Sequence, residues 1–249
     1  MGPMVSIIMP TYNSSRHITQ SIESVRRQTY LHWELLITDD CSQDNTRELI
    51  KQFQQIDSRI KLFTSKVNGG AGCARNNSIA EAKGRFIAFL DSDDMWAPKK
   101  LELQIEFMKA NKIGLSYTAY QKIDSQGNSQ GIITPPKQTT YSKLLYGNVI
   151  GCLTAIYDTA IVGKKYMPTI RKRQDMGLWL DILKDIPHAE SLSDVLASYR
   201  HDSGMTKNKF KILKWQWVFY RDVLKFNILK ASYYFLFYAI NGLVKSKKY

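Results

Sequence analysis

The sequence predicts an α/β fold in which a mainly parallel central sheet is flanked by helices. Two observations lead to this prediction. Four short apolar segments alternate with segments of helical periodicity over residues 5–97 of the 249-residue chain. Polar motifs follow these apolar segments, where parallel strands reach the ligand-binding edge of an α/β sheet. The sequence therefore predicts a ligand site at the carboxyl ends of the strands.

The first half of the chain contains four predicted strands separated by helices. Residues 5–9 are apolar and end at Pro10, which predicts a strand. The helical spacing of Ile18, Ile22 and Val25 predicts a helix over residues 15–28. The same criteria predict strands at residues 33–38, 60–64 and 86–90 and helices at residues 46–56 and 73–83. Regular alternation of this kind is typical of a parallel sheet.

The elements after Pro98 are mixed without regular alternation. A helix is predicted up to about residue 111, and a turn and a Pro135-Pro136 break follow the next strand. Strands are predicted at residues 114–123 and 149–157, a strand or extended segment at residues 192–199, and a helix at residues 174–183. This irregular half is expected to serve substrate binding.

The composition is that of a folded globular protein with an uneven charge distribution. Hydrophobic residues make up 44% of the chain, and its three cysteines, which lack metal-ligand spacing, fit a reducing cytosol. No secretory signal is recognised before the first strand. Residues 205–249 hold nine lysines and one arginine against one aspartate, out of a net charge of +13. A basic tail on a nearly neutral body predicts a docking surface rather than a nucleic-acid site.

The segment Asp91-Ser92-Asp93-Asp94 is the most informative part of the sequence. Three carboxylates within four residues directly follow an apolar strand. Such carboxylates repel one another, and a divalent cation between them would offset the repulsion. Oxygen ligands suit Mg²⁺ or Mn²⁺, which often bridge to substrate phosphates. The alternative is an acidic turn that begins the next helix, since Pro98 follows.

Three other motifs lie at the same predicted edge, and each has a structural alternative. Asp39-Asp40 can accept hydrogen bonds from a base or a sugar, or can form part of a turn. The loop at residues 68–72 lacks a dinucleotide fingerprint and can be a simple turn, although Arg75 follows it in the first turn of a helix. Tyr12 can stack on a base or pack against its own strand.

The order and spacing of these motifs resemble the inverting family 2 glycosyltransferases, including those that build bacterial surface polysaccharides. The resemblance is dense over residues 5–97 and thinner up to about residue 201. It is carried by Pro10-Thr-Tyr-Asn13, Thr38-Asp-Asp-Cys-Ser-Gln-Asp-Asn-Thr46, Asn68-Gly-Gly-Ala-Gly-Cys-Ala-Arg-Asn76 and Phe89-Leu-Asp-Ser-Asp-Asp94. It implies a GT-A fold and a nucleotide-diphosphate sugar as donor.

The resemblance also implies a set of donor-site residues. Thr11, Tyr12, Asp40 and Arg75 match positions that hold the nucleobase, with uracil expected. The full set of nucleotide-sugar residues that it implies is Pro10, Thr11, Tyr12, Asp40, Asn68, Arg75, Asp91 and Ser92. Asp93 matches the direct metal ligand and Asp91 the shared ribose and metal position, whereas Asp94 has no implied role. Mn²⁺ or Mg²⁺ is the expected cofactor.

Residues 173–201 match later parts of the same family pattern. Asp175 matches the catalytic base, although Gln174 replaces the usual glutamate before it. Trp179 lies one helical turn beyond Asp175 and is expected either to form an acceptor platform or to pack in the core. His201, in a segment that resembles a late metal or diphosphate region, is a weaker candidate for a metal ligand.

The C-terminal tail is predicted to be amphipathic and helical. Its lysines are interleaved with aromatic residues, and its apolar stretch at residues 231–244 is shorter than the roughly 20 residues needed to span a bilayer. These features suit a helix in an anionic membrane interface. The alternatives are packing on the chain's own domain or on the partner in a homodimer.

Together these expectations describe a metal-dependent, inverting hexosyltransferase that uses a UDP-sugar. Its acceptor is expected to be a lipid-linked saccharide in bacterial capsule, O-antigen or other surface-polysaccharide synthesis, at the cytoplasmic face of the plasma membrane. Residues 4–97 form the nucleotide-sugar half, residues 98–204 the acceptor half and residues 205–249 the tail. One rival is a haloacid-dehalogenase-type phosphatase, which Met95 disfavours. The other is an anionic-polymer or nucleic-acid binding module.

Overall fold

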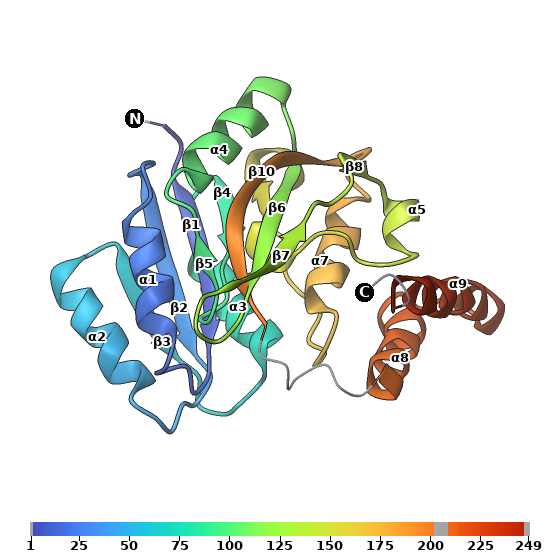
Figure 1. The fold of residues 1–249 in the computed structure, drawn as a ribbon, viewed down its shortest axis with the longest axis horizontal. Coiled ribbons are helices and arrows are strands. Elements are labelled where there is room, and N and C mark those ends of the chain that lie inside the picture. Colours follow the sequence, from blue (N-terminus) through green and yellow to red (C-terminus); the bar gives the residue numbers. More distant parts are fainter. Residues whose placement is uncertain (1, 202–208, 247–249) are drawn as a thin grey trace.

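The computed structural model describes residues 2–201 and 209–246, with side chains of the last two helices described over residues 212–240. Its centre is one mixed sheet with strand order β3-β2-β1-β4-β9-β6-β10-β5. Two short strands lie off this path, because β7 pairs with β6 and β8 pairs with β10. The two predicted halves of the chain therefore share one continuous sheet (Figure 1).

The first half forms the parallel part of the sheet, as predicted. Its strands are β1 (Val5–Thr11), β2 (Trp33–Asp39), β3 (Ile60–Thr64) and β4 (Phe86–Phe89). Its helices are α1 (Ile18–Arg26), α2 (Thr46–Ile56) and α3 (Ala71–Glu81). The pairings of β1 with β2, β1 with β4 and β2 with β3 are all parallel. Helix α3 begins two residues before the predicted start.

Strand β1 continues through Pro10, beyond its predicted end. The carbonyl of Ile8 accepts a hydrogen bond from Leu90, so residue 8 is directed toward β4. Because the backbone groups of a strand alternate in direction with a period of two residues, the backbone nitrogen of Pro10 also faces β4. The last residue pair between β1 and β4 is Ile8 with Phe89, so β4 has already ended beside Pro10. The missing N–H of proline therefore leaves no bond of the sheet unmade.

The second half adds strands and helices in irregular order. The strands are β5 (Met95–Trp96), β6 (Leu115–Ile123), β7 (Ser129–Ile133), β8 (Gln138–Thr139), β9 (Ile156–Asp158) and β10 (Ala189–Arg200). The helices are α4 (Lys100–Asn111), α5 (Tyr141–Leu144), α6 (Thr159–Val162) and α7 (Gln174–Ile182). Strand β10 is parallel to β6, whereas β9 is antiparallel to both β4 and β6. Strand β7 was not predicted, because most of its residues are exposed and show no buried face.

The predicted strand at residues 149–157 is largely wrong. Residues Cys152–Thr154 form a 3₁₀ turn, and only Ile156–Asp158 pair in the sheet. The hydroxyl of Thr154 donates to the carbonyl of Gly151 and closes this turn. The run is apolar because Leu153 is buried in the core, and burial alone does not distinguish a strand from a turn.

Helices cover both faces of the sheet and bury two separate apolar clusters. Val5, Ile7 and Met9 contribute to one cluster and Ile8 to the other, as alternation along a strand requires. Helices α1, α2 and α4 pack on the first face, and α3 and α7 on the second. Figure 1 shows α1 and α2 on one side and α7 with the C-terminal helices on the other.

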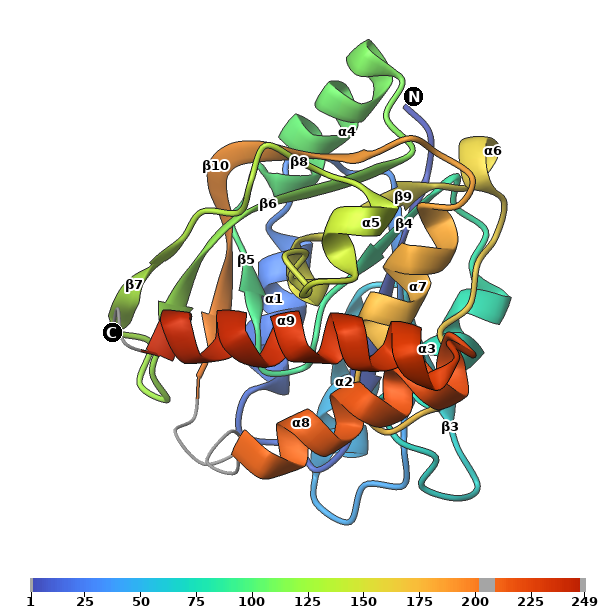
Figure 2. The same cartoon turned by 90° about the vertical axis from the view of Figure 1, so that its right-hand side faces the viewer.

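The C-terminal tail is helical, as predicted, over its described residues 209–246, and it packs on its own domain; residues 205–208 and 247–249 of the predicted tail lie outside the described residues. It consists of α8 (Lys209–Val218), a π-helical turn (Phe219–Val223) and α9 (Ile228–Ser246). Phe219, Tyr220 and Ala231 are fully buried in the cluster that contains α7. Figure 2 shows α9 lying across the face of the molecule in front of α7. Within the described residues, no helix has the length and apolarity needed to cross a membrane.

Candidate active site

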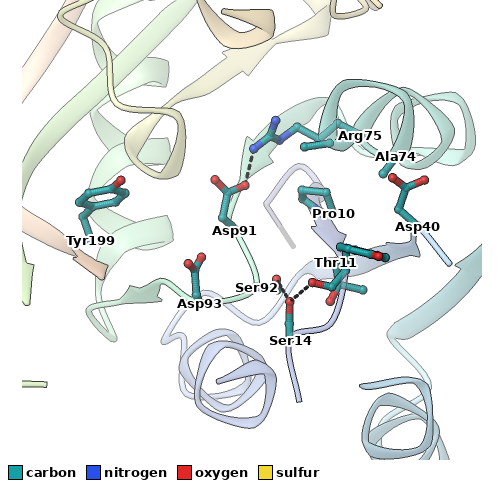
Figure 3. Close-up of a pocket in the computed structure, with 12 residues that line it drawn as sticks. Pro10, Thr11, Ser14, Asp40, Ala74, Arg75, Asp91, Ser92, Asp93 and Tyr199 are labelled. Carbon is teal, nitrogen blue, oxygen red and sulfur yellow. Dashed lines mark hydrogen bonds and ion pairs between the residues drawn. The ribbon is translucent and has the colours of Figure 1, made fainter. Parts of the chain in front are cut away.

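A cavity of about 280 Å³ opens at the carboxyl ends of β1, β2 and β4. It brings together most of the residues predicted from the sequence, which come from four separate segments: Pro10, Thr11, Tyr12, Asp40, Arg75, Asp91, Ser92 and Asp93. Figure 3 shows Asp40 and Tyr199 on opposite sides of the view, with Asp91 and Asp93 between them. The residues that the sequence motifs singled out therefore meet at one cavity.

Asp40 is nearly buried and holds the glycine-rich loop. Its carboxylate accepts hydrogen bonds from the backbone N–H groups of Gly69 at 3.0 Å and Gly70 at 2.7 Å. The side chain of Asn68 donates to the backbone carbonyl of Asp40 but does not line the cavity. Asn68 thus supports the loop from outside. Gly70 has a φ of +83°, a conformation that residues with a β-carbon rarely adopt.

Gly72 allows the glycine loop to approach the start of α7. A β-carbon at this position would lie 2.8 Å from Cγ of Gln174 and 3.3 Å from the carbonyl oxygen of Pro168. Gln174 is itself buried. Gln174, the first residue of α7, therefore packs directly against the glycine-rich loop.

Arg75 forms an ion pair with Asp91 across the floor of the cavity. The distance from Nη2 to Oδ1 is 2.5 Å (Figure 3). Burial lowers the pKa of the Arg75 guanidinium, but the charge and hydrogen bond of Asp91, together with the charges of Cys152 and Asp175, outweigh burial, and the net pKa is raised. The arginine is therefore charged, and it orients a carboxylate at the site. Its Nε is buried without a partner among the described residues.

Asp94 has a structural role that the sequence did not indicate. Its carboxylate is buried, and Oδ1 accepts a hydrogen bond from the backbone N–H of Arg200 at 2.8 Å. The Arg200 guanidinium in turn donates to the carbonyl of Asp93. Burial, followed by the charges of Asp93 and Asp91, raises the pKa of Asp94 well above its usual value. These bonds fasten the acidic segment to the end of β10.

The donor set fits a divalent metal ion. Asp91 and Asp93, two residues apart in the chain, both line the cavity. Such hard oxygen ligands suit Mg²⁺ or Mn²⁺. His201 is exposed at the end of β10, and no group of three His, Cys, Asp or Glu side chains suited to a metal occurs in the described part of the chain.

A second and larger cleft of about 990 Å³ adjoins the first, and Asp175 lines it. Tyr199 lines both cavities. The side-chain amide of Asn148 donates to Oδ2 of Asp175 at 2.8 Å. Burial raises the pKa of Asp175 despite the opposing influence of the Met176 N–H and of Arg75. This combination yields an oriented carboxylate that is a stronger base than an exposed aspartate.

Trp179 belongs to the core and presents no surface to an acceptor. Its side chain is fully buried and packs edge-to-face on Phe89, with ring centroids 5.4 Å apart. Of the two interpretations of this tryptophan, the structure supports core packing. The side chain of Trp179, one helical turn beyond Asp175, points inward because α7 is enclosed by α9 and by the sheet.

Sequence analysis missed four residues that line or support these cavities. The hydroxyl of Ser14 lies 2.8 Å from that of Ser92 at the first cavity. Asn148, Arg173 and Lys122 line the second cleft. A positive φ of 68° at Arg173 marks an unusual backbone, but φ is not visible in the sequence. Arg173 opens the segment that resembles the family, but that resemblance gave it no role, and the other three residues stand in no recognised motif.

The sequence profile described as Glycosyl transferase family 2 matches residues 6–157. Among the relatives, the Escherichia coli protein WfgD is 44% identical over 244 residues, which cover 97% of this chain and 94% of WfgD. WfgD is described as a UDP-Glc:alpha-D-GlcNAc-diphosphoundecaprenol beta-1,3-glucosyltransferase. TuaG of Bacillus subtilis, which carries the name of a teichuronic acid biosynthesis glycosyltransferase, is 40% identical over 245 residues, 98% of this chain and 97% of TuaG.

Solved structures share the fold at lower sequence identity. S. aureus TarS in complex with UDP-GlcNAc superposes with a TM-score of 0.72 at 22% identity. The match covers 86% of this chain and 65% of that one, which is less than two thirds of TarS. Mannosyltransferase PcManGT from Pyrobaculum calidifontis, solved with GDP-Man and Mn²⁺, superposes with a TM-score of 0.69 at 16% identity. The match covers 94% of this chain and 70% of the PcManGT chain.

Proposed function

The chain belongs to glycosyltransferase family 2 and has the GT-A fold, and from this premise we propose that it is a metal-dependent, inverting hexosyltransferase. Its donor is a UDP-sugar and its acceptor a lipid-linked saccharide. The observation that carries the proposal is the pair of adjoining cavities. One collects Asp40, Asp91 and Asp93, and the other contains Asp175.

The first cavity suits a nucleoside diphosphate. Tyr12 is 49% exposed at its edge and offers a ring on which a base can stack. The hydroxyl of Thr11 is buried without a described partner, so it has hydrogen-bonding capacity to offer to a ligand. WfgD, with a UDP-sugar in its name, and TarS, solved with UDP-GlcNAc, support uridine as the nucleoside.

Asp91 and Asp93 are the residues that would hold Mn²⁺ or Mg²⁺. The bound ion supplies positive charge that stabilises the departing diphosphate. Arg75 orients Asp91 through their ion pair, and Arg200 supports Asp93 through its backbone carbonyl. The Mn²⁺ in PcManGT, a protein of the same fold, supports a divalent ion as the cofactor.

Asp175 acts as the general base. Asn148 fixes one carboxylate oxygen of Asp175, and Asp175 lines the cleft in which an acceptor hydroxyl would lie. Removal of that proton makes the hydroxyl oxygen a nucleophile. Attack on the side of the sugar opposite to the departing diphosphate then inverts the anomeric centre, with no covalent intermediate on the protein.

Family membership excludes the two rival functions. The haloacid-dehalogenase-type phosphatase shares the Asp-x-Asp pattern but belongs to another family. An anionic-polymer or nucleic-acid binding module would be non-catalytic. The relatives that match this chain over nearly its whole length are named as glycosyltransferases.

The biological role proposed is bacterial surface-polysaccharide synthesis, such as O-antigen or capsule assembly. WfgD is named for a diphosphoundecaprenol acceptor and TuaG for teichuronic acid biosynthesis. We propose that the protein works as a peripheral protein on the inner face of the plasma membrane, where such acceptors are found.

The outer face of α9 supports the membrane proposal. This face, defined as Leu229, Tyr233, Leu236, Phe237 and Ile240, is exposed, and its members recur at helical spacing. Leu229 is 79% exposed and Leu236 is 58% exposed. The surrounding tail carries nine lysines, which suits an anionic lipid surface. His201 remains a weaker proposal as a metal ligand.

A donor screen tests the proposal. The purified protein is incubated with UDP-sugars and GDP-sugars, with and without Mn²⁺, and its melting temperature is measured. We expect a UDP-sugar to stabilise it only with the metal ion. Transfer is then measured with a lipid-linked acceptor, and the anomeric configuration of the product is read by NMR. Stabilisation by GDP-sugars alone, or retention of configuration, would contradict the proposal.

A further inference from the structure

The cleft beside Asp175 has two cationic side chains on its walls. Lys122 belongs to β6, and Arg173 immediately precedes α7. Asp175 is the single carboxylate among the residues that line the cleft. A neutral sugar can be held by hydrogen bonds alone. The excess of positive charge therefore indicates that the cleft receives an anionic group.

The guanidinium of Arg173 is oriented by α9. It donates a hydrogen bond to the phenol oxygen of Tyr238, and its Cζ lies 5.4 Å from the centroid of the Tyr238 ring. A guanidinium has five N–H donors in a planar fork. The contact with Tyr238 thus limits the rotation of the fork and leaves other donors available to a ligand in the cleft.

Lys122 has no side-chain partner among the described residues. It is half-buried on β6 and pairs through the backbone with Tyr199 of β10. Tyr199 lines both cavities, so Lys122 lies near the junction between the donor and acceptor sides. A half-buried ammonium without a counter-ion loses part of its hydration and gains most from an anionic ligand.

We infer that Arg173 and Lys122 bind the diphosphate of the lipid-linked acceptor while a hydroxyl of its sugar lies at Asp175. This inference rests on the proposed function. In the acceptor named for WfgD, the sugar that is glycosylated carries the diphosphate on the same ring. An anion site within the cleft that holds the base is therefore what such an acceptor requires. The lipid chain then leaves the cleft beside α9, to which Tyr238 belongs.

The test compares two synthetic ligands that differ only in the diphosphate. One is α-GlcNAc joined through a diphosphate to an undecyl chain, and the other is the undecyl glycoside of α-GlcNAc. Their affinities for the full-length protein are measured calorimetrically in the presence of UDP and Mn²⁺. We expect the diphosphate ligand to bind at least about tenfold more tightly, as charge-assisted hydrogen bonds allow.

Arg173→Gln and Lys122→Gln are expected to remove most of this preference. Tyr238→Phe, which keeps the ring but removes the hydroxyl, is expected to reduce it partly. Lys172→Gln is the matched control, because it removes one charge from an exposed neighbour that does not line the cleft. A wild-type protein that binds both ligands equally or binds neither, or an Arg173→Gln variant with the full preference, overturns the inference.

Two further measurements separate this inference from its premise and from other anions. UDP affinity with Mn²⁺ is expected to be unchanged in Arg173→Gln, because Arg173 does not line the donor cavity. Loss of UDP binding in that variant would assign Arg173 to the donor and contradict the inference. Competition by vesicles of anionic phospholipid that depends on Arg173 would assign the site to lipid headgroups instead. Failure of the wild type to bind UDP would count against the proposed function itself.

Discussion

At the residue scale, the proposed chemistry depends on carboxylates that look alike in the sequence but differ in their surroundings. Asp93 lines the proposed donor cavity, Asp94 is buried beside it in the chain, and Asp175 lines the proposed acceptor cleft. The partners differ as well. Asp94 accepts from the backbone of Arg200, whereas Asp175 accepts from the side chain of Asn148. These differences predict distinct effects of mutation.

Asp175→Asn is expected to retain UDP binding and lose transfer by about 10²–10⁴-fold, the usual contribution of a general base. The asparagine keeps the contact with Asn148 but cannot take a proton. Because it also removes a buried charge, its melting temperature is expected to equal or exceed that of the wild type. Calorimetry and a single-turnover assay check this. An Asn variant with normal turnover would show that the base lies elsewhere.

The pH dependence of transfer should report the same carboxylate. A base works only when it is deprotonated, so activity falls as the pH falls through its pKa. Burial raises the pKa of Asp175, which places the acid limb at a higher pH than an exposed aspartate would. The pH profile of kcat at saturating donor and metal measures this limb. A limb in the ordinary aspartate range, near pH 4, would contradict the assignment.

Asp93→Ala is expected to abolish metal-dependent UDP binding, whereas Asp94→Asn is expected to keep the affinity within about threefold. The alanine removes an oxygen ligand from the cavity. The asparagine at residue 94 preserves the oxygen that accepts from the Arg200 N–H. Titration of UDP with and without Mn²⁺ compares the two variants. Equal losses in both would mean that Asp94 is itself a ligand.

At the scale of elements, a single glutamate ties the parallel strands together. Glu34 of β2 is buried and accepts from the Ser6 hydroxyl at 2.7 Å, the Lys83 N–H at 2.8 Å and the Lys61 ammonium at 2.8 Å. These donors come from β1, from the segment before β4 and from β3. Burial raises the pKa of Glu34, but the hydrogen bonds and the charge of Lys61 outweigh it, so the net pKa is lowered.

Glu34→Gln is expected to cost about 1–3 kcal/mol of the free energy of unfolding, the usual effect of disrupting a buried charged hydrogen-bond network. Folding lowers the pKa of Glu34, so its contribution to the free energy of unfolding is fully present when the pH is above the pKa of Glu34 in the unfolded chain. This contribution is lost as the pH falls through the pKa of Glu34 in the folded protein. Urea unfolding of both proteins at pH 7 and near pH 4 measures it. Glu48→Gln, on the exposed side of α2, is the matched control. A difference that does not shrink with acid would contradict this role.

At the scale of the whole molecule, the C-terminal helices complete the core and also present an apolar surface. The inner side of α9 includes Ala231, which is fully buried, and Tyr234, which packs on Tyr146 with centroids 5.1 Å apart. Deleting the tail would uncover this core. The membrane proposal is therefore tested by substitutions on the outer face of α9.

The double variant Leu236→Ser with Ile240→Ser is expected to lose most binding to anionic vesicles at low salt while keeping its melting temperature. Both side chains are exposed, so their loss costs the fold little. Vesicle flotation measures binding, and Leu31→Ser, 70% exposed in the loop before β2, is the matched control. Unchanged flotation would contradict the proposal. A change from dimer to monomer in light scattering would assign the face to a second copy instead.

The sequence alone determined the parallel half of the fold and which motifs meet at the first cavity. Apolar runs, helical spacing and turn residues are local signals, and the carboxyl ends of parallel strands converge by geometry. For this reason, the motifs that contain Tyr12, Asp40 and Asp93 can be assigned to one site from the amino-acid sequence itself. The local signals failed at residues 149–155, where an apolar run buries a turn rather than a strand.

Only the tertiary structure decided what surrounds each carboxylate. Asn148 is 27 residues from Asp175, and Arg200 is 106 residues from Asp94, and no local pattern joins such pairs. The burial of Trp179 depends on how the sheet and the C-terminal helices enclose α7. The acceptor cleft likewise exists only because β6, β10 and the segment before α7 meet there. Burial and long-range partners are properties of the packed chain, since they are set by contacts between distant segments.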